Sequence, residues 1–231
     1  MDIKRLREGL GLFRSSDGRR WLWFTLRKRL YSRGISIGVR RDLQEYIAGD
    51  PARDLAAVPP AKIPIVVRKL QPDDDLSFIQ DDPGLDPRNR QIRADQRWLM
   101  TGDLPTPWVA LDSDGAVCFM TFLLTARDNA AIRARWGDLL PELQPDEALF
   151  EGPYAGENIR GLGMMKDVLR QVLLSAQDDG VRYVSGFIGD ANVPSLKVAE
   201  FGGFDPYLKR EDRWVLFRRR IRFLPFENAA E

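Results

Sequence analysis

The chain has 231 residues, 44% of them hydrophobic and 30% charged, a composition typical of one globular domain with an added segment. It contains no histidine and one cysteine, which excludes Ser-His-Asp and Cys-His nucleophile sites, histidine-based zinc sites and a disulfide framework, so no metal site is expected. The formal net charge is only +1, yet basic residues concentrate in the first forty-odd positions.

Residues 1–60 are interpreted as a basic N-terminal extension that ends in a proline-rich linker, DLAAVPPAKIP, and residues 61–231 as one domain. The stretch RRWLWFTLRKRLYSRG has the composition of an interfacial membrane helix, so peripheral membrane contact is one interpretation. Binding to nucleic-acid phosphates is another, and packing of the aromatic residues against the domain is the one we favour. The longest apolar run there, WLWFTL, is too short to span a bilayer, and we expect a cytoplasmic protein.

In the first half of the domain, the sequence predicts a strand, then two helices, then a two-stranded hairpin. IPIVVRKL is typical of a strand, QPDDDLSFI of a helix start with capping aspartates, and PRNRQIRADQRWLMTGD of a second helix. TPWVALDSDGAVCFMTFLLTA predicts a hairpin that turns at Gly115. Cys118 lies in its apolar second half and is interpreted as a buried small hydrophobe.

The second half alternates strands and helices. RDNAAIRARWGDLL indicates a helical stretch, DEALFEGPY and VRYVSGFIG strands, NVPSLKVAEFGGF a helix capped by Asn192, and RWVLFRRRIRF a final strand. Between the two middle strands, seven apolar residues fall on one helical stripe that ends at Gly180: Met164, Met165, Val168, Leu169, Val172, Leu173 and Ala176. The arginines of RRRIRF suit an edge strand protected from aggregation, and no nucleic acid is expected as a partner.

The stretch NIRGLGMM places two glycines between a predicted strand and this helix. Such a turn presents backbone N–H groups at the positive end of the helix dipole, where a phosphate can bind. Gly161 and Gly163 lack the Cβ atoms that would keep a pyrophosphate away from the backbone. The Walker lysine and the third glycine of the dinucleotide fingerprint are both missing, so by itself the pattern favours a tight turn over a phosphate site.

The context of this turn resembles the GNAT superfamily of acyl-CoA-dependent N-acyltransferases over about residues 63 to 223. Asn158, Gly161 and Gly163 match its first motif, Gln/Arg-x-x-Gly-x-Gly/Ala, and Asn192, Ser195 and Gly203-Phe204 match its second. The resemblance implies an α/β (α+β) fold, with a mixed and mostly antiparallel sheet flanked by helices. Asn158 departs from the Gln or Arg of the family pattern, which puts that side-chain contact in doubt.

The resemblance also implies acetyl-CoA as cofactor. The backbone amides from Arg160 to Met165 would cradle the pyrophosphate of coenzyme A, and Asn192 would contact the pantetheine arm, with Ser195 in the same motif. The strand end at Tyr154 and Ala155 would splay from RYVSGFI and admit the pantetheine. The implied cofactor-binding residues are Tyr154, Ala155, Asn158, Arg160, Gly161, Leu162, Gly163, Met164, Met165, Asn192 and Ser195.

Transfer of an acetyl group to an amine needs a base, and without histidine we expect a carboxylate. Glu147 and Glu151 lie four residues apart on one predicted strand and so on one face of it. Glu147 is the residue we match to the base of the family and Glu151 is the second candidate. Each could equally be an ordinary solvated carboxylate.

The general acid is open. Many family members have a tyrosine before the Gly-Phe pair, whereas this chain has SLKVAEF there, so Tyr154, Tyr207 or water would stand in. Alternatively, the chain is a catalytically weak or inactive acyl-CoA-binding regulatory module. Direct transfer is favoured over a covalent intermediate, because Cys118 has no histidine to activate it.

The acceptor is expected to be a small-molecule or peptide amine of unknown identity. The aspartates of PDDDLSFIQDDPGLDP would suit a cationic acceptor such as a polyamine or amino sugar, but a solvated acidic loop that caps helices explains them as well. The sequence does not indicate an oligomeric state.

Overall fold

The computed structural model describes residues 27–50, 52–159 and 162–226. The chain divides into two compact units, one formed by residues 37–207 and the other by residues 1–36 together with 208–231. Residues 37–60 therefore belong to the larger unit. The boundary predicted near residue 60 lies within that unit. None of the described helices is both long and apolar enough to cross a bilayer.

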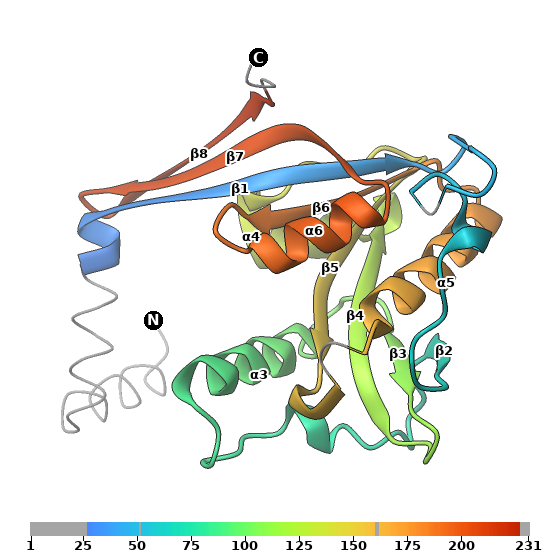
Figure 1. Ribbon diagram of the computed structural model, residues 1–231. Helices are drawn as coiled ribbons and strands as arrows, with labels where there is room; N and C mark the ends of the chain where they lie inside the picture. Colours follow the sequence, from blue (N-terminus) through green and yellow to red (C-terminus); the bar gives the residue numbers. More distant parts are fainter. Residues whose placement is uncertain (1–26, 51, 160–161, 227–231) are drawn as a thin grey trace. The chain divides into compact units, whose positions relative to one another are not determined.

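Eight strands hydrogen-bond in the order β2-β3-β4-β5-β6-β1-β7-β8 (Figure 1). Their bounds are β1 Tyr31–Asp42, β2 Val66–Lys69, β3 Trp108–Leu111, β4 Val117–Thr125, β5 Glu147–Ala155, β6 Tyr183–Gly189, β7 Asp205–Val215 and β8 Arg218–Pro225. The β2-β3, β3-β4, β4-β5 and β7-β8 pairs are antiparallel and the β5-β6 pair is parallel. This mixed, mostly antiparallel sheet confirms the predicted fold class.

Within the larger unit, helices cover both faces of the sheet. The longer helices are α3 Pro87–Leu99, α4 Asn129–Trp136, α5 Met164–Asp178 and α6 Val193–Phe201. One core cluster joins the apolar stripe of α5 and Ala199 of α6 to Phe119 and Ala148 in the sheet. The other joins Leu99 of α3 and Ile132 of α4 to the opposite faces of the same strands. Alternating side chains of β4 and β5 thus pack into two separate cores, one on each face of the sheet.

Most of the predicted elements are present. The apolar stripe predicted from Met164 to Ala176 is the buried face of α5, and Gly180 follows the helix with φ +81°. Gly115, with φ +78°, lies in the turn of the predicted β3-β4 hairpin. The side-chain oxygen of Asn192 accepts a hydrogen bond from the Ser195 N–H, as expected for the cap of α6. QPDDDLSFI, predicted to start a helix, forms only the short 3-10 helix η2, Ser77–Ile79.

Two strands differ from the prediction. The segment 213–223 was predicted as one final strand but contains a two-residue turn at Leu216 and Phe217, which separates β7 from β8. Neither residue is typical of a turn, so the sequence offered no signal for it. The other is β1, which lies inside the predicted basic extension and was not anticipated. β8 is the last strand in the order and confirms the interpretation of RRRIRF as an edge strand.

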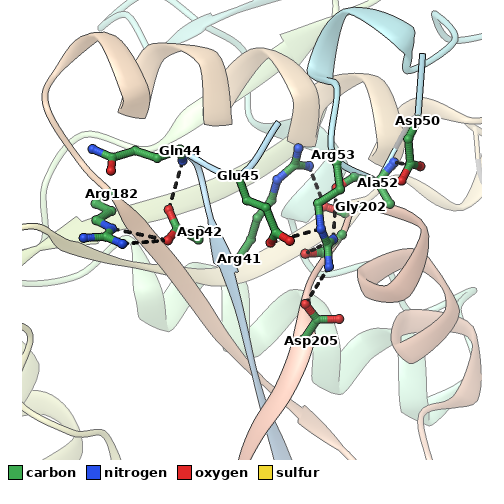
Figure 2. Close-up of polar contacts among 11 residues, drawn as sticks. Arg41, Asp42, Gln44, Glu45, Asp50, Ala52, Arg53, Arg182, Gly202 and Asp205 are labelled. Carbon is green, nitrogen blue, oxygen red and sulfur yellow. Dashed lines mark hydrogen bonds and ion pairs between the residues drawn. The ribbon is translucent and has the colours of Figure 1, made fainter. Parts of the chain in front are cut away.

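Two arginines hold the segment that follows β1 against the end of α6 (Figure 2). Arg41 is buried and donates from its Nη1 to the Gly202 carbonyl at 2.6 Å. Arg53 donates to the Gly203 carbonyl at 3.1 Å and to the Asp205 carboxylate at 2.8 Å, and it also pairs with Glu45. Residues 41–53 therefore fix the position of the Gly203-Phe204 motif.

Candidate functional site

The site is built around the divergence of β5 and β6. Their parallel pairing is confined to Glu147–Leu149 opposite Tyr183–Ser185, although β5 continues to Ala155 and β6 to Gly189. Beyond Leu149 the two strands therefore separate from each other. This agrees with the expectation that the strand ending at Tyr154 and Ala155 splays from RYVSGFI.

A β-bulge bends β5 as it leaves β6. The register with β4 shifts between Met120 and Phe122, which lie opposite Tyr154 and Glu151, and Gly152 between them has φ +62°. A Cβ atom on Gly152 would also lie 2.5 Å from Leu99 Cδ1 of α3. Glycine is thus needed for both the backbone conformation and the close approach of α3.

The N-terminus of α5 follows the divergent end of β5 in the chain. Gly163 caps this helix in the left-handed conformation, with φ +80°, and Met164 directly after it is buried. The first N–H groups of any α-helix lack an intrahelical acceptor and lie at the positive end of its dipole. The prediction that this end of α5 binds a phosphate is therefore compatible with the position of Gly163 at the helix start.

The structure describes some of the other residues that were predicted to bind the cofactor, but not all of them. Leu162 is half-buried, and its carbonyl accepts from the Lys62 N–H at 2.9 Å. Asn158 belongs to the 3-10 helix η5, Glu157–Ile159, whereas Arg160 and Gly161 lie outside the described residues. Because the Asn192 oxygen caps α6, a contact from Asn192 to a ligand would use its amide nitrogen.

Glu147 lies at the start of β5, where β5 and β6 still pair. Its carboxylate accepts from the Gln144 N–H at 3.0 Å and lies 3.7 Å from Nη1 of Arg40. The Arg40 guanidinium in turn stacks against the rings of Tyr183 and Tyr207, at 4.7 and 4.9 Å from their centroids. Glu147 is therefore engaged in a polar cluster at the closed end of the strand pair.

Glu151 lies four residues further along β5, about 13 Å for a regular strand. The β4-β5 register is regular from Ala148 to Glu151, so the two glutamates lie on one face of the strand, as predicted. Glu151 comes after the last residue that pairs with β6 and directly before Gly152. Of the two carboxylates, Glu151 is the one at the divergent part of β5.

Tyr154 lies in a polar cluster that was not predicted. Its hydroxyl donates to the Glu157 carboxylate at 2.7 Å and accepts from Nε of Arg93 on α3 at 3.2 Å. Arg93 also binds Glu157 directly, at 2.6 Å. The Tyr154 ring is buried and stacks on Phe78, with centroids 5.6 Å apart. This Arg93-Tyr154-Glu157 cluster fixes the end of β5 to α3.

The same contacts set the ionisation of the cluster. Burial alone would raise the pKa of Glu157, but the hydrogen bonds from Arg93 and Tyr154 outweigh it and lower that pKa to about 2. Burial and the neighbouring Glu157 carboxylate raise the pKa of Tyr154. The cluster therefore contains a carboxylate and a protonated phenol at neutral pH.

Only weak signals in the sequence pointed to Arg93 and Glu157. Glu157 follows Tyr154 by three residues, which is compatible with a local contact at a strand end. Arg93 is separated from Glu157 by 64 residues and is one of four arginines in PRNRQIRADQRW. The pairing of Arg93 with Glu157 depends on how α3 packs on the sheet, which residue spacing does not encode.

Cys118 is buried, and its thiol donates to the Ala110 carbonyl at 3.3 Å. Burial raises the pKa of this thiol to about 11. A thiolate at Cys118 is thus disfavoured, which supports the prediction of direct transfer over a covalent intermediate.

The acidic stretch between β2 and α3 is largely occupied by structural contacts. Asp74 binds Arg68 at 2.6 Å, and Asp81 pairs with Arg90. Asp75 and Asp82 accept from the N–H groups two residues later, and Asp86 caps α3. These contacts favour the interpretation of the stretch as a helix-capping loop over a role in binding a cationic acceptor.

No protein-family model matches the chain, and no curated protein matches it. Among solved structures, it is similar to a GCN5-related glucosamine N-acetyltransferase region of a fungal multi-domain GH3 β-N-acetylglucosaminidase. The TM-score is 0.54 and the identity 15%, over 85% of this chain and 23% of that one. A functionally unknown conserved protein from Staphylococcus epidermidis gives a TM-score of 0.50 and 9% identity, over 82% of this chain and 64% of that one.

A GCN5-related N-acetyltransferase from Sphaerobacter thermophilus is similar at a TM-score of 0.44 and 13% identity, over 91% of this chain and 55% of that one. The chain thus spans less than two thirds of each of these three proteins. At such identities the likeness shows the fold alone, and the fold assignment uses the match at a TM-score of 0.54. The diverging β5-β6 pair and the glycine-capped α5 described above are consistent with it. The chain therefore has the fold of the GNAT superfamily of N-acyltransferases.

Proposed function

We propose that the chain is an acyl-CoA-dependent N-acetyltransferase that moves an acetyl group from acetyl-CoA directly to an amine. The observation that carries the proposal is the separation of β5 from β6 after Leu149, followed in the chain by the glycine-capped N-terminus of α5. Divergent strands expose backbone groups to which an extended ligand can hydrogen-bond, and the helix end can bind its phosphates. This combination suits a long, phosphate-bearing cofactor.

The residues around this opening fit acetyl-CoA, which when bound supplies an acetyl group activated as a thioester. Backbone amides from Arg160 to Met165 would hold its pyrophosphate. Tyr154 and Ala155 at the end of β5 would border the pantetheine arm, and Asn192 with Ser195 would contact it from α6. Among the described residues, the nearest atom to a Cβ placed on Gly163 is Ala61 Cα, at 4.0 Å.

Glu151 is the base that we propose, with Glu147 as the second candidate. Glu151 lies beyond Leu149, the last residue of β5 that pairs with β6, whereas Glu147 lies within the part that pairs with β6. A carboxylate at the divergent part of the strand can take a proton from an incoming ammonium group, directly or through a water.

Tyr154 is proposed to hold the end of β5 in place and to be a weak proton donor. Its hydroxyl already donates to Glu157, and removal of that proton would leave a phenolate beside a carboxylate. The leaving thiolate would then take its proton from water, which a thiol of pKa about 8.5 tolerates. Tyr154→Phe should therefore reduce turnover less than a change of the base.

The experiment is an assay of free thiol release from acetyl-CoA with a panel of amines that includes amino sugars, polyamines and peptides. Turnover by the wild type would identify the acceptor class. Glu151→Gln should then lower kcat by about 100-fold or more and leave acetyl-CoA affinity nearly unchanged. Glu147→Gln is the matched control on the same strand face and should lower kcat less than Glu151→Gln. An equal loss in both variants, or none in Glu151→Gln, would contradict the assignment.

The second candidate function is a catalytically weak or inactive acyl-CoA-binding regulatory module. The observation that favours it is the hydrogen bond from the Tyr154 hydroxyl to Glu157, together with the sequence KVAEF, which offers no hydroxyl where a family tyrosine is expected. A protein that binds acetyl-CoA but releases no thiol with any amine of the panel would support this module over the enzyme.

A further inference from the structure

The second unit of the chain is strongly basic. Its described residues, 27–36 and 208–226, contain eleven lysines and arginines against two acidic residues, Glu211 and Asp212. Glu211 pairs with Arg33 and Asp212 pairs with Arg219. Both acidic side chains of this part are thus paired with arginine. The basic side chains outnumber the acidic ones by nine. The net charge of +1 for the whole chain hides this local excess.

The β7-β8 hairpin in this unit ends in an apolar two-residue turn. Val215 lies opposite Arg218, so Leu216 and Phe217 alone form the loop, with φ of +49° and +65°. Two successive positive φ angles are the pattern of a type I′ turn, which strongly prefers Asn-Gly. Leucine and phenylalanine are costly in this conformation, and turn propensity therefore does not explain their presence.

The same two side chains are exposed. Leu216 keeps 70% of its surface in solvent and Phe217 keeps 52%. Their N–H groups donate to the carbonyls of Leu30 and Arg29, which brings exposed Leu30 and Tyr31 next to the turn. The result is an apolar tip, formed by Leu30, Tyr31, Val215, Leu216 and Phe217, whose five side chains are all exposed.

Basic and aromatic residues surround this apolar tip. Arg29 and Arg219 lie over the Trp214 ring, 5.6 and 5.7 Å from its centroid. Arg213 lies 5.8 Å from the centroid of Tyr31, and Arg218 follows the turn directly. Apolar residues surrounded by arginine and tryptophan have the composition of segments that bind at the boundary between acyl chains and anionic headgroups.

We propose that the tip of the β7-β8 hairpin docks on an anionic lipid bilayer. Leu216 and Phe217 would enter the interfacial region, and the surrounding arginines would bind the headgroup phosphates. Each basic residue near an anionic membrane surface contributes about 1 kcal/mol. A polyanion such as nucleic acid would satisfy the charge but would give no reason for a strained, exposed Leu-Phe pair at the end of the hairpin.

The test is flotation of the full chain with vesicles of phosphatidylcholine alone and with vesicles of equimolar phosphatidylcholine and phosphatidylglycerol. The wild type should float with the anionic vesicles only, and rising salt should weaken its binding. Fluorescence anisotropy with a single-stranded oligonucleotide runs in parallel. Failure to bind anionic vesicles, with or without tight binding of the oligonucleotide, would overturn the proposal.

The decisive variant is Leu216→Asn with Phe217→Gly. It installs the residues that a type I′ turn prefers, so the hairpin should fold at least as well, but the apolar tip is removed. We expect about tenfold weaker partition into anionic vesicles or worse. Wild-type partition by a variant whose circular dichroism and thermal unfolding show that it is folded would contradict the proposal.

A second variant tests the charge. Arg218→Gln with Arg220→Gln should weaken partition about thirty-fold, at about 1 kcal/mol for each basic residue. The matched control removes two exposed cations from the larger unit, through Arg127→Gln with Lys197→Gln, and should leave partition near the wild-type value. Equal losses in the two charge variants would indicate attraction by net charge and would overturn docking through the hairpin.

Discussion

At the scale of single residues, Glu157 connects the ionisation of the site to the stability of the fold. Its pKa is lowered to about 2 from a reference value of 4.5. A carboxylate with a depressed pKa stabilises the folded state above its unfolded pKa, and this contribution is lost as the pH falls through the folded pKa. The contribution of Glu157 should thus be complete above about pH 4.5 and fade toward pH 2.

Glu157→Gln should lower the free energy of unfolding by about 2 kcal/mol at pH 7, because Arg93 and Tyr154 lose a charged acceptor. The difference from the wild type should shrink between about pH 4.5 and pH 2. Urea unfolding at a series of pH values measures it. Asp81→Asn, which removes an exposed ion pair with Arg90, serves as control and should change the free energy of unfolding less than Glu157→Gln does. A pH-independent gap for Glu157→Gln would refute this assignment.

Gly203 tests how tightly residues 41–53 hold the end of α6. Its φ is +71°, and a Cβ atom would lie 1.8 Å from the Ala52 carbonyl oxygen. Gly203→Ala should therefore destabilise the fold by more than about 2 kcal/mol. Gly49→Ala is the control, because Gly49 has φ +77° with nothing within 4 Å of its Cβ position and so experiences the backbone strain alone. Thermal unfolding should separate the two variants, and equal effects would show that the contact with Ala52 is unimportant.

At the scale of secondary-structure elements, α5 carries more than its buried stripe. Asp167 in its first turns is buried, and its carboxylate accepts from the Ala61 N–H at 3.0 Å and from Arg170 at 2.8 Å. Burial would raise the pKa of Asp167, but these hydrogen bonds lower it. The carboxylate thus attaches the segment before β2 to the N-terminal part of α5, beside the proposed cofactor cradle.

Asp167→Ala should lower the free energy of unfolding by about 2 kcal/mol and should speed hydrogen exchange of the Ala61 N–H, which loses its acceptor. Asp178→Ala at the exposed C-terminal end of the same helix is the control and should change neither quantity. Unchanged protection of Ala61 in Asp167→Ala would mean that other contacts hold this segment.

Elements with a strong local pattern could be predicted from the sequence. The apolar stripe of α5 and the Asn192 cap of α6 follow from residue spacing and capping chemistry alone. β1 also has a period-two pattern at Ile35, Ile37 and Val39, but the basic composition of the extension concealed it. The β7-β8 turn has no glycine, asparagine or proline, so its position depends on contacts with Leu30 and Arg29 rather than on its own residues.

At the scale of the whole molecule, the chain combines a GNAT-fold unit, residues 37–207, with a basic hairpin unit. The glycine-capped start of α5 could be predicted because its signal lies in one local motif, NIRGLGMM. The Arg93-Tyr154-Glu157 cluster could not, because it joins α3 to the end of β5 across 61 and 64 residues. The proposal of Glu151 over Glu147 as base likewise depends on the point at which β5 leaves β6, which residue spacing does not give.

Calorimetric titration with acetyl-CoA tests the central claim most directly. Gly163→Glu places a carboxylate at the N-terminus of α5, where the account expects the pyrophosphate. Gly180→Glu makes the same change at a left-handed glycine after the other end of the helix, with φ +81° against +80°. We predict binding by the wild type and Gly180→Glu and none by Gly163→Glu. No binding by the wild type, or equal binding by both variants, would contradict it.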